Sequence, residues 1–595
     1  MPRALFAVLV CCLLALAALP GGCMSNPPLA IELSPGTQVT TPSAVVILVD
    51  GMGREDYQRL LEAGRLPNIE KYLLRRGVSV EQAVASYPSI TYANLVSLLT
   101  GVLPGHHGVI GNKWFDRDRL VYESYTHVKT FSRADTDYTH QTIYELLRDE
   151  FTASILTPVR RGATRSYDNV ISYGAAWALD WQDTVNKLTT CRLTEIAELS
   201  NRAGRWPRLI TAYYVTPDTV GHRFGASHPR YTEILLDVDR QVGNVCQGLE
   251  RAGLLDKTYV TLISDHGFVD TPRHTDIVRY FSQELGVETR QTLFGRDDKL
   301  EERLAHFGPA RAVIVTGGDR RCAIHLRAGE HWWQRPNAME IDGFAARFAR
   351  RGTTLPAPSR AGASTLSAEQ GDPSNPVTML PEVAMMPQGT TMPVLGAAMP
   401  EDRTLPGMLA ALPAVDLVVV RLGPNTLRVQ TAEGMGIIER IIRDGRKLYR
   451  YRVFRGKDPL GYDKPPVPWK GSEFHPAEAW FEQTLGTPRP DAVVQLAEMN
   501  DSPRNGDIVL FARDGWDFGT KNRGGHGGVT RKELLVPWLV AGPGLPAGGH
   551  VSAARTVDLT PTLLDLLGRA ELIPCEADGR SIAGQLRQAS VAAGK

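Results

Sequence analysis

The chain has 595 residues, of which 43% are hydrophobic, and its formal net charge is +1. This length allows several domains, or one large domain with insertions around a sizeable core. The near-neutral charge gives no indication of a nucleic-acid polymer or another polyanion as a partner.

The N-terminal residues predict export. One early arginine is followed by an apolar run from Ala4 to Leu19 and then by small residues, which is the layout of a bacterial signal peptide. The run is too short to be a comfortable membrane span. Residues 19–23, Leu-Pro-Gly-Gly-Cys, resemble a lipoprotein cleavage box in which Cys23 would carry the lipid. Residues 1–23 are therefore predicted to be a lipoprotein or plain signal peptide, followed by a linker over residues 24–43.

This leader predicts a periplasmic protein, a protein anchored by lipid at the outer membrane, or a secreted one. A lipid on Cys23 would be the only membrane contact. Four cysteines remain for an oxidising compartment, where they allow two disulfides, and their wide spacing argues against a cysteine-based metal site. They are Cys191, Cys246, Cys322 and Cys575.

Apolar strand-like segments alternate with helix-like segments along the first half of the chain. Residues 44–50 (AVVILVD), 209–218 (LITAYYVTPD) and 259–267 (YVTLISDHG) are apolar runs that end in acidic residues or histidine. Helices are expected over residues 56–75 and 228–253, with another strand near Val78. This alternation predicts an α/β fold with a mostly parallel central sheet and helices on both of its faces.

The second half is more varied. Residues 353–413 have few helix or strand signals and are predicted to be a flexible insertion between two parts of a catalytic domain, 44–352 and 414–595. Residues 414–431 predict a β-hairpin and residues 447–454 a further strand, which together form a small β-containing insertion. Residues 533–544 predict a last core strand, and residues 557–568 a short helix.

Six candidate metal ligands stand at strand ends or in loops flanked by glycine, where α/β folds place functional groups. Each motif alone has an ordinary structural explanation as a turn or a helix cap. Three Asp and three His form a set suited to zinc, and six ligands are too many for one tetrahedral ion with an open position. They divide into two sites of about three ligands each, as in two-metal phosphoryl transfer. The six are Asp50, Asp218, His222, Asp265, His266 and His526.

In this order the motifs resemble the alkaline phosphatase superfamily, and within it the nucleotide pyrophosphatase/phosphodiesterases and the phosphatases with a threonine nucleophile. The resemblance spans residues 45–545 and implies a three-layer α/β sandwich. It also implies two zinc ions, one held by Asp218, His222 and His526. The other would be held by Asp50, Asp265 and His266 together with the nucleophile. That nucleophile falls on Thr91 in "PSITYAN", and a family Asn that contacts a phosphoryl oxygen falls on Asn112 in "HGVIGN".

The mechanism that this resemblance implies is physically sensible. A threonine hydroxyl is a poor nucleophile, but coordination to a dication lowers its pKa, so that attack on phosphorus gives a phosphothreonine. Asn112 and the Thr91 backbone N–H would stabilise the equatorial oxygens. Asn94 is expected to support the loop that carries the nucleophile.

The ester that is cleaved stays open at this point. Diesterases of this branch usually have proline before the Asn of the threonine motif, where this chain has Ala93. Trp114 could stack on a base or belong to the core, and Arg160 or Arg161 could contact a phosphate dianion or lie in a solvated turn. We expect a small nucleotide-type substrate with a phosphodiester or pyrophosphate bond. The alternatives are a phosphomonoesterase or a metal-binding surface lipoprotein without catalysis.

Overall fold

A computed structural model describes residues 29–126, 130–168, 176, 180–291, 295–317, 320–348, 401–463, 473–519 and 521–591. The predicted signal peptide, Cys23 and residues 353–400 of the predicted insertion lie outside these residues. Among the helices that are described, none is long and apolar enough to cross a membrane. The four cysteines outside the leader form no disulfide with one another.

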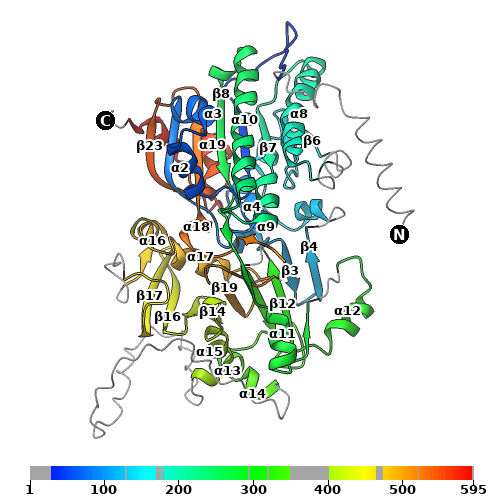
Figure 1. The fold of residues 1–595 in the computed structure, drawn as a ribbon, viewed down its shortest axis with the longest axis vertical. Coiled ribbons are helices and arrows are strands. Elements are labelled where there is room, and N and C mark those ends of the chain that lie inside the picture. The colour runs from blue at the N-terminus through cyan, green and yellow to red at the C-terminus, as the bar shows by residue number, and fades with distance from the viewer. Residues whose placement is uncertain are drawn as a thin grey trace.

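A first sheet of nine strands forms the upper body in Figure 1. Five of its eight neighbouring pairs are parallel, so the sheet is mixed but mostly parallel, as predicted. The expected strand at 533–544 is present as β22, but it runs antiparallel to both of its neighbours. In spatial order the strands are β24 (Ser590–Val591), β23 (Gly549–Arg555), β2 (Gly77–Val84), β22 (Leu535–Ala541), β8 (Thr258–Ser264), β1 (Ser43–Val49), β7 (Leu209–Tyr214), β5 (Thr152–Ile155) and β6 (Arg165–Tyr167).

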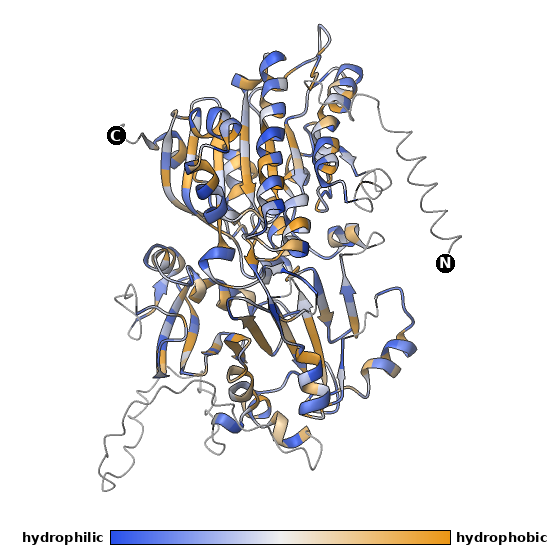
Figure 2. Cartoon of the chain, in the orientation of Figure 1, coloured by the Kyte–Doolittle hydropathy of each residue, from blue (hydrophilic) through white to orange (hydrophobic). Residues whose placement is uncertain are grey.

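Helices cover both faces of this sheet. Alternate side chains of β1 enter two separate cores, with Ile47 on one side and Val46 on the other. The first core includes helices α2 (Arg54–Glu62), α8 (Gln182–Ala203) and α10 (Pro229–Arg251), and the second includes α4 (Thr91–Thr100) and α19 (Leu559–Leu566). Figure 2 shows the apolar strands between helices that carry hydrophilic residues beside hydrophobic ones. The expected three-layer α/β architecture is confirmed.

A second sheet of nine strands forms the lower body in Figure 1. The predicted hairpin is β14 and β15, and the predicted strand at 447–454 is β17. The prediction of a small β-containing insertion is wrong in size, because strands from 289–326 and 508–512 join the same sheet. In order they are β11 (Thr289–Arg290), β12 (Ala312–Gly317), β13 (Arg321–Leu326), β19 (Ile508–Ala512), β14 (Val415–Gly423), β15 (Thr426–Gln430), β16 (Gly434–Arg443), β17 (Arg446–Gly456) and β18 (His475–Pro476).

The predicted insertion also extends too far at its C-terminal end. Helix α15 (Leu405–Ala410) lies within the range 353–413, and the Thr404 hydroxyl caps it by accepting from the N–H of Gly407 at 3.1 Å. Its leucines are buried in the core of the second sheet. This helix was not predicted because it is short and follows a low-complexity sequence. Tertiary packing stabilises it.

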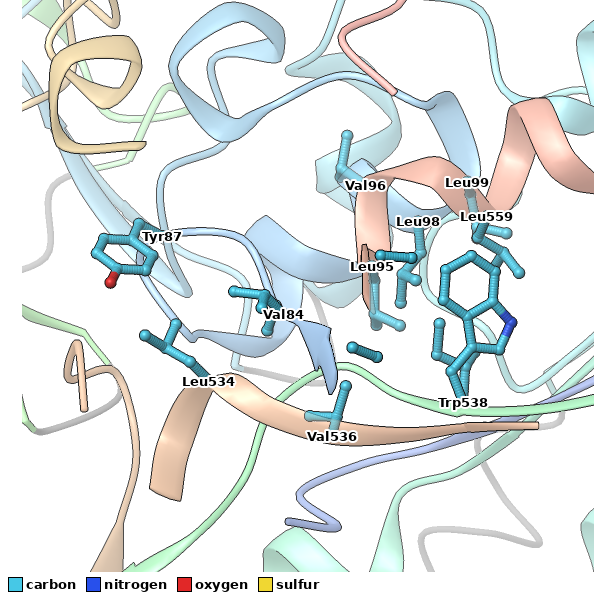
Figure 3. Close-up of a cluster of buried hydrophobic side chains, with 14 of the residues drawn as sticks. Val84, Tyr87, Leu95, Val96, Leu98, Leu99, Leu534, Val536, Trp538 and Leu559 are labelled. Atoms are coloured by element: carbon cyan, nitrogen blue, oxygen red, sulfur yellow. The ribbon is translucent and has the colours of Figure 1, made fainter. Parts of the chain in front are cut away.

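Helix α4 is buried along its whole length. Figure 3 shows Leu95, Leu98 and Leu99 facing Trp538 and Val536 of β22. Because the helix is enclosed on every side, the position of its first residue, Thr91, is fixed by the packing of the core.

Candidate active site

The predicted nucleophile lies at the start of α4. The Thr91 hydroxyl is 3.1 Å from Nε2 of His266, and the residue is 7% exposed. Asn94 fixes the preceding loop: its Oδ1 accepts from the N–H of Ser86 at 2.8 Å, and its Nδ2 donates to the carbonyls of Ser86, Pro88 and Ile90. Asn94 therefore supports the loop, as expected.

The topology brings the six predicted ligands together. Asp50 follows β1, and Asp265 and His266 follow β8. Asp218 and His222 lie in helix α9 (Thr216–Phe224), which follows β7. Because β1 lies between β7 and β8 and is parallel to both, these strand ends meet at one edge of the sheet.

The ligand atoms form two adjoining groups. Asp218 Oδ1 lies 3.3 Å from Nε2 of His222 and 3.3 Å from Nε2 of His526. In the other group, His266 Nε2 lies 3.3 Å from Asp50 Oδ1 and 3.5 Å from Asp265 Oδ2. Asp218 is also within metal-site distance of Asp50 and His266, so one carboxylate lies between the two groups.

Both groups contain buried polar atoms that have no hydrogen-bond partner. These are Asp50 Oδ1, Asp218 Oδ1, Asp265 Oδ2 and His526 Nε2. The opposite oxygens are held by the fold: the Tyr213 hydroxyl donates to Asp50 Oδ2, and the N–H groups of Gly51 and His266 donate to Asp265 Oδ1. An unpaired buried polar atom is unfavourable, and this set of carboxylate oxygens and imidazole nitrogens fits divalent cations such as zinc.

Each histidine is oriented by its other ring nitrogen. Nδ1 lies 2.9 Å from the Gly524 carbonyl in His222, 3.1 Å from that of Gly267 in His266, and 2.9 Å from that of Ser89 in His526. Donation from Nδ1 leaves the lone pair on Nε2, which is the arrangement of metal-binding histidines. The rings of His266 and His526 also stack, with centroids 3.7 Å apart.

The electrostatics of the site also favour a cation. Burial raises the pKa of Asp50, and the nearby Asp218 charge raises it further. Burial and the Asp50 charge likewise raise the pKa of Asp265. Burial opposes ionisation of Asp218, but the charge and hydrogen bond of His222, together with electrostatic interactions with His526 and His266, outweigh burial and lower the pKa of Asp218. Burial and the neighbouring His266 lower the pKa of His526, which keeps its imidazole neutral and able to bind a metal.

The predicted substrate-binding residues lie in different environments, Asn112 beside the start of α4 and Trp114 in the core. Asn112 Oδ1 accepts from the N–H of Tyr92 at 3.1 Å, so this amide lies beside the start of α4 and can turn its Nδ2 to a substrate. Trp114 is 1% exposed and donates to the Tyr125 hydroxyl at 2.7 Å, which makes it a core residue.

The two arginines are held by the surrounding fold. Arg160 pairs with Asp168. Arg161 Nε donates to Glu145 at 2.9 Å, and its other nitrogens donate to the carbonyls of Asp135, Tyr138 and His140. The contacts of Trp114 and Arg161 are made with the fold and not with Thr91.

Sequence reasoning missed several residues that hold the site. Tyr213, which binds Asp50, looks in the sequence like any aromatic residue of a buried strand. Ser89 looks in the sequence like a turn residue, yet its hydroxyl donates to the Gly528 carbonyl at 2.8 Å and accepts from the N–H of Gly527 at 3.1 Å. Arg320 and Glu533 form an ion pair, and Glu533 accepts from the N–H of Gly528. Neither residue carried a signal in the sequence beyond its charge.

Comparison with known proteins shows similarity to one family over part of the chain. A model described as type I phosphodiesterase / nucleotide pyrophosphatase matches residues 44–331. An uncharacterized pyrophosphatase/phosphodiesterase of Schizosaccharomyces pombe is 28% identical over 242 residues, which cover 40% of this chain and 47% of the relative. The bis(5'-adenosyl)-triphosphatase of Xenopus laevis is 27% identical over 237 residues, which cover 39% of this chain and 48% of the relative.

This chain thus spans about half the length of the curated relatives it matches. Among solved structures, murine ectonucleotide pyrophosphatase/phosphodiesterase 5 is similar, with 16% identity and a TM-score of 0.48 over 92% of this chain and 99% of that one.

Proposed function

We propose that this chain, whose residues 44–331 match the family model described as type I phosphodiesterase / nucleotide pyrophosphatase, is an exported phosphohydrolase with two zinc ions. Its substrates are small nucleotide-type molecules with a phosphodiester or pyrophosphate bond. The observation that carries this proposal is the Thr91 hydroxyl, 3.1 Å from His266 Nε2 and beside buried carboxylate atoms that have no partner.

The residues fit two zinc ions. Asp218, His222 and His526 would hold one ion, and Asp50, Asp265 and His266 would hold the other together with the Thr91 hydroxyl. Bound zinc would lower the pKa of that hydroxyl and stabilise negative charge on phosphoryl oxygens.

Residues of this chain supply the nucleophile and the hydrogen-bond donors to the phosphoryl oxygens. Thr91 Oγ1 attacks phosphorus, the bond from phosphorus to the leaving oxygen breaks, and water then hydrolyses the phosphothreonine. Thr91 is the first residue of α4, so its N–H has no partner within the helix and would donate to incoming negative charge. Asn112 Nδ2 is the second donor for the equatorial oxygens, because Asn112 Oδ1 already binds Tyr92.

The contacts of the two arginines support a diester over a monoester. A monoester dianion carries one more negative charge and needs an additional cation at the site. Arg161 is fully engaged by Glu145 and by backbone carbonyls, and Arg160 is neutralised by Asp168. A diester carries a single negative charge and needs no additional cation.

The signal-peptide pattern of residues 1–23 supports export, and Cys23 is the residue that a lipid anchor would modify. Export would place the enzyme where extracellular or periplasmic nucleotides are its substrates.

The test compares hydrolysis of bis-p-nitrophenyl phosphate and p-nitrophenyl phosphate by the zinc-loaded protein, before and after chelation. We expect faster turnover of the diester and loss of both activities on chelation. Faster turnover of the monoester would support the phosphomonoesterase alternative, and turnover of neither would contradict the proposed function.

A further inference from the structure

A fully buried ion pair joins the two sheets beside the site. Arg320 directly precedes β13 of the second sheet, and Glu533 lies in helix α18 (Arg531–Leu534), which leads into β22 of the first sheet. Both residues are 0% exposed. Arg320 Nε donates to Glu533 Oε1 at 2.7 Å, and Nη2 lies 3.4 Å from Oε2.

The guanidinium of Arg320 is held in one orientation. Its Nη1 donates to the carbonyls of Arg513 at 3.2 Å and Trp516 at 2.9 Å, and its Nη2 donates to that of Ala512 at 3.1 Å. The backbone N–H of Arg320 donates to the carbonyl of His526 at 3.2 Å. Because the five donors of a guanidinium are fixed in one plane, this set of partners leaves the group no alternative position.

Glu533 holds the loop that carries His526. Its Oε1 accepts from the N–H of Gly528 at 2.7 Å, and its Oε2 accepts from the Thr530 hydroxyl at 2.9 Å. A Cβ at position 528 would lie 2.2 Å from Glu533 Oε2, so the loop needs glycine there. The backbone carbonyl of Glu533 accepts from the N–H of Gly267, the residue after His266, at 2.7 Å.

The same loop contacts the segment that carries the nucleophile. Ser89, two residues before Thr91, bonds to Gly527 and Gly528 through its hydroxyl, and its carbonyl accepts from His526 Nδ1. A continuous series of hydrogen bonds therefore runs from the second sheet through Arg320, Glu533 and Gly528 to the loop before Thr91.

We propose that Arg320 and Glu533 are positioning residues, through which the second sheet holds His526, His266 and the Thr91 loop in the geometry that binds metal and reacts. Neither side chain contacts the reacting atoms. The catalytic part of this inference rests on the proposed function, whereas the metal-binding part requires no substrate.

The test uses the full chain with Arg320→Met, Glu533→Gln and, as a matched control, Arg117→Met. Arg117 is a second buried arginine, 4% exposed, which bonds to Asp507 at 2.5 Å; the hydrogen bonds described for it reach none of the site loops. Zinc affinity is measured by competition with a chromophoric chelator, cobalt coordination by its absorption spectrum, and stability by thermal unfolding.

We expect all three variants to lower the midpoint of thermal unfolding. Only Arg320→Met and Glu533→Gln should weaken zinc binding, by about 10–100-fold, and alter the cobalt spectrum. They should also lower kcat more than they raise KM. If Arg320→Met does not fold, Glu533→Gln decides, because glutamine keeps the shape and one acceptor of the original side chain.

Zinc affinity within about twofold of the unmodified chain in a folded Glu533→Gln would overturn the inference, as would an equal loss in Arg117→Met. A protein that binds zinc but cleaves no ester would contradict the proposed function instead, and the affinity measurements would still decide this inference.

Discussion

At the scale of single residues, each carboxylate of the second ligand group divides its two oxygens between the fold and the candidate metal. Asp50 gives one oxygen to Tyr213 and leaves the other without a hydrogen-bond partner, and Asp265 does the same with two backbone N–H groups. The fold therefore sets the direction in which the second oxygen points. Hydrogen bonds to the residues that coordinate a metal commonly determine how tightly the metal binds.

Removing the hydroxyl that orients Asp50 tests this division. Tyr213→Phe should weaken zinc binding by about 10–100-fold, because the carboxylate can then rotate. Tyr214→Phe is the matched control, since the hydroxyl of this neighbouring residue bonds to Thr190 at 2.9 Å on the other face of the strand. Zinc titration measures both, and equal affinities in the two variants would show that Tyr213 has no orienting role.

The candidate ligands could be recognised in the sequence because they follow apolar strands or stand between glycines, and the structure brings them together. Tyr213 could not, because two adjacent tyrosines in a buried strand give the same pattern whichever of them faces the site. Trp114 and Arg161 have side chains suited to a substrate, and only their contacts show that both belong to the fold.

At the scale of elements, helix α4 and the loop before it work as one rigid unit. The helix is enclosed by core residues, and the amide of Asn94 satisfies four backbone groups of the loop. Such rigidity suits the proposed nucleophile Thr91, because small misplacements of a nucleophile lower the rate steeply.

Asn94→Ala tests this unit. We expect the free energy of unfolding to fall by about 1–3 kcal/mol, because buried backbone groups lose their partners, and we expect kcat to fall as well. Ser97 lies in the same helix as Asn94, and its hydroxyl is 3.1 Å from Nε2 of His107 in α5 (Pro104–His107). Ser97→Ala should reduce stability without a comparable loss of kcat. Urea unfolding and diester turnover measure the two effects, and unchanged kcat in Asn94→Ala would exclude a positioning role for the amide.

Five strands of the first sheet (β1, β2, β7, β8 and β22) and the 414–431 hairpin could be predicted from local apolar patterns and turn residues. The second sheet could not be assembled from the sequence, because its strands come from stretches around 290–326, 415–476 and 508–512. Tertiary packing decides which of these strands pair, and the local periodicity of the sequence carries no information about that pairing.

At the scale of the whole molecule, a network of charges holds α5 (Pro104–His107), which follows α4, against the second sheet and the C-terminal region. His106 lies 2.8 Å from Glu498, 3.2 Å from Asp501 and 2.7 Å from Asp578. Lys447 and Arg440, from strands β17 and β16, also bind Glu498. These cations supply the positive charge that a metal would bring, so we interpret this cluster as an ion-pair network.

This network predicts a pH dependence of stability. Burial opposes the charge on His106, but hydrogen bonds to Asp501, Asp578 and Glu498 outweigh it and raise the pKa to about 11. A pKa above the unfolded value means that the charged form stabilises the fold. The contribution is therefore complete below about pH 6.5 and is lost as the pH rises toward 11.

His106→Gln measures that contribution. The difference in unfolding free energy between the unmodified chain and the variant should be largest near pH 6 and should shrink steadily at pH 8 and pH 9. Urea unfolding at these three values gives the difference directly. A difference that stays constant over this range would mean that His106 does not hold a raised pKa.

The central claim is that Thr91 is the nucleophile of a metal-dependent phosphoric ester hydrolase, and zinc-loaded Thr91→Ala tests it most directly. We predict that turnover of bis-p-nitrophenyl phosphate falls by roughly a thousandfold or more, while the protein stays folded and still binds zinc. Thr91→Ser should keep part of the activity, because it retains a hydroxyl at the start of α4. Full turnover by a folded, zinc-loaded Thr91→Ala would contradict the account.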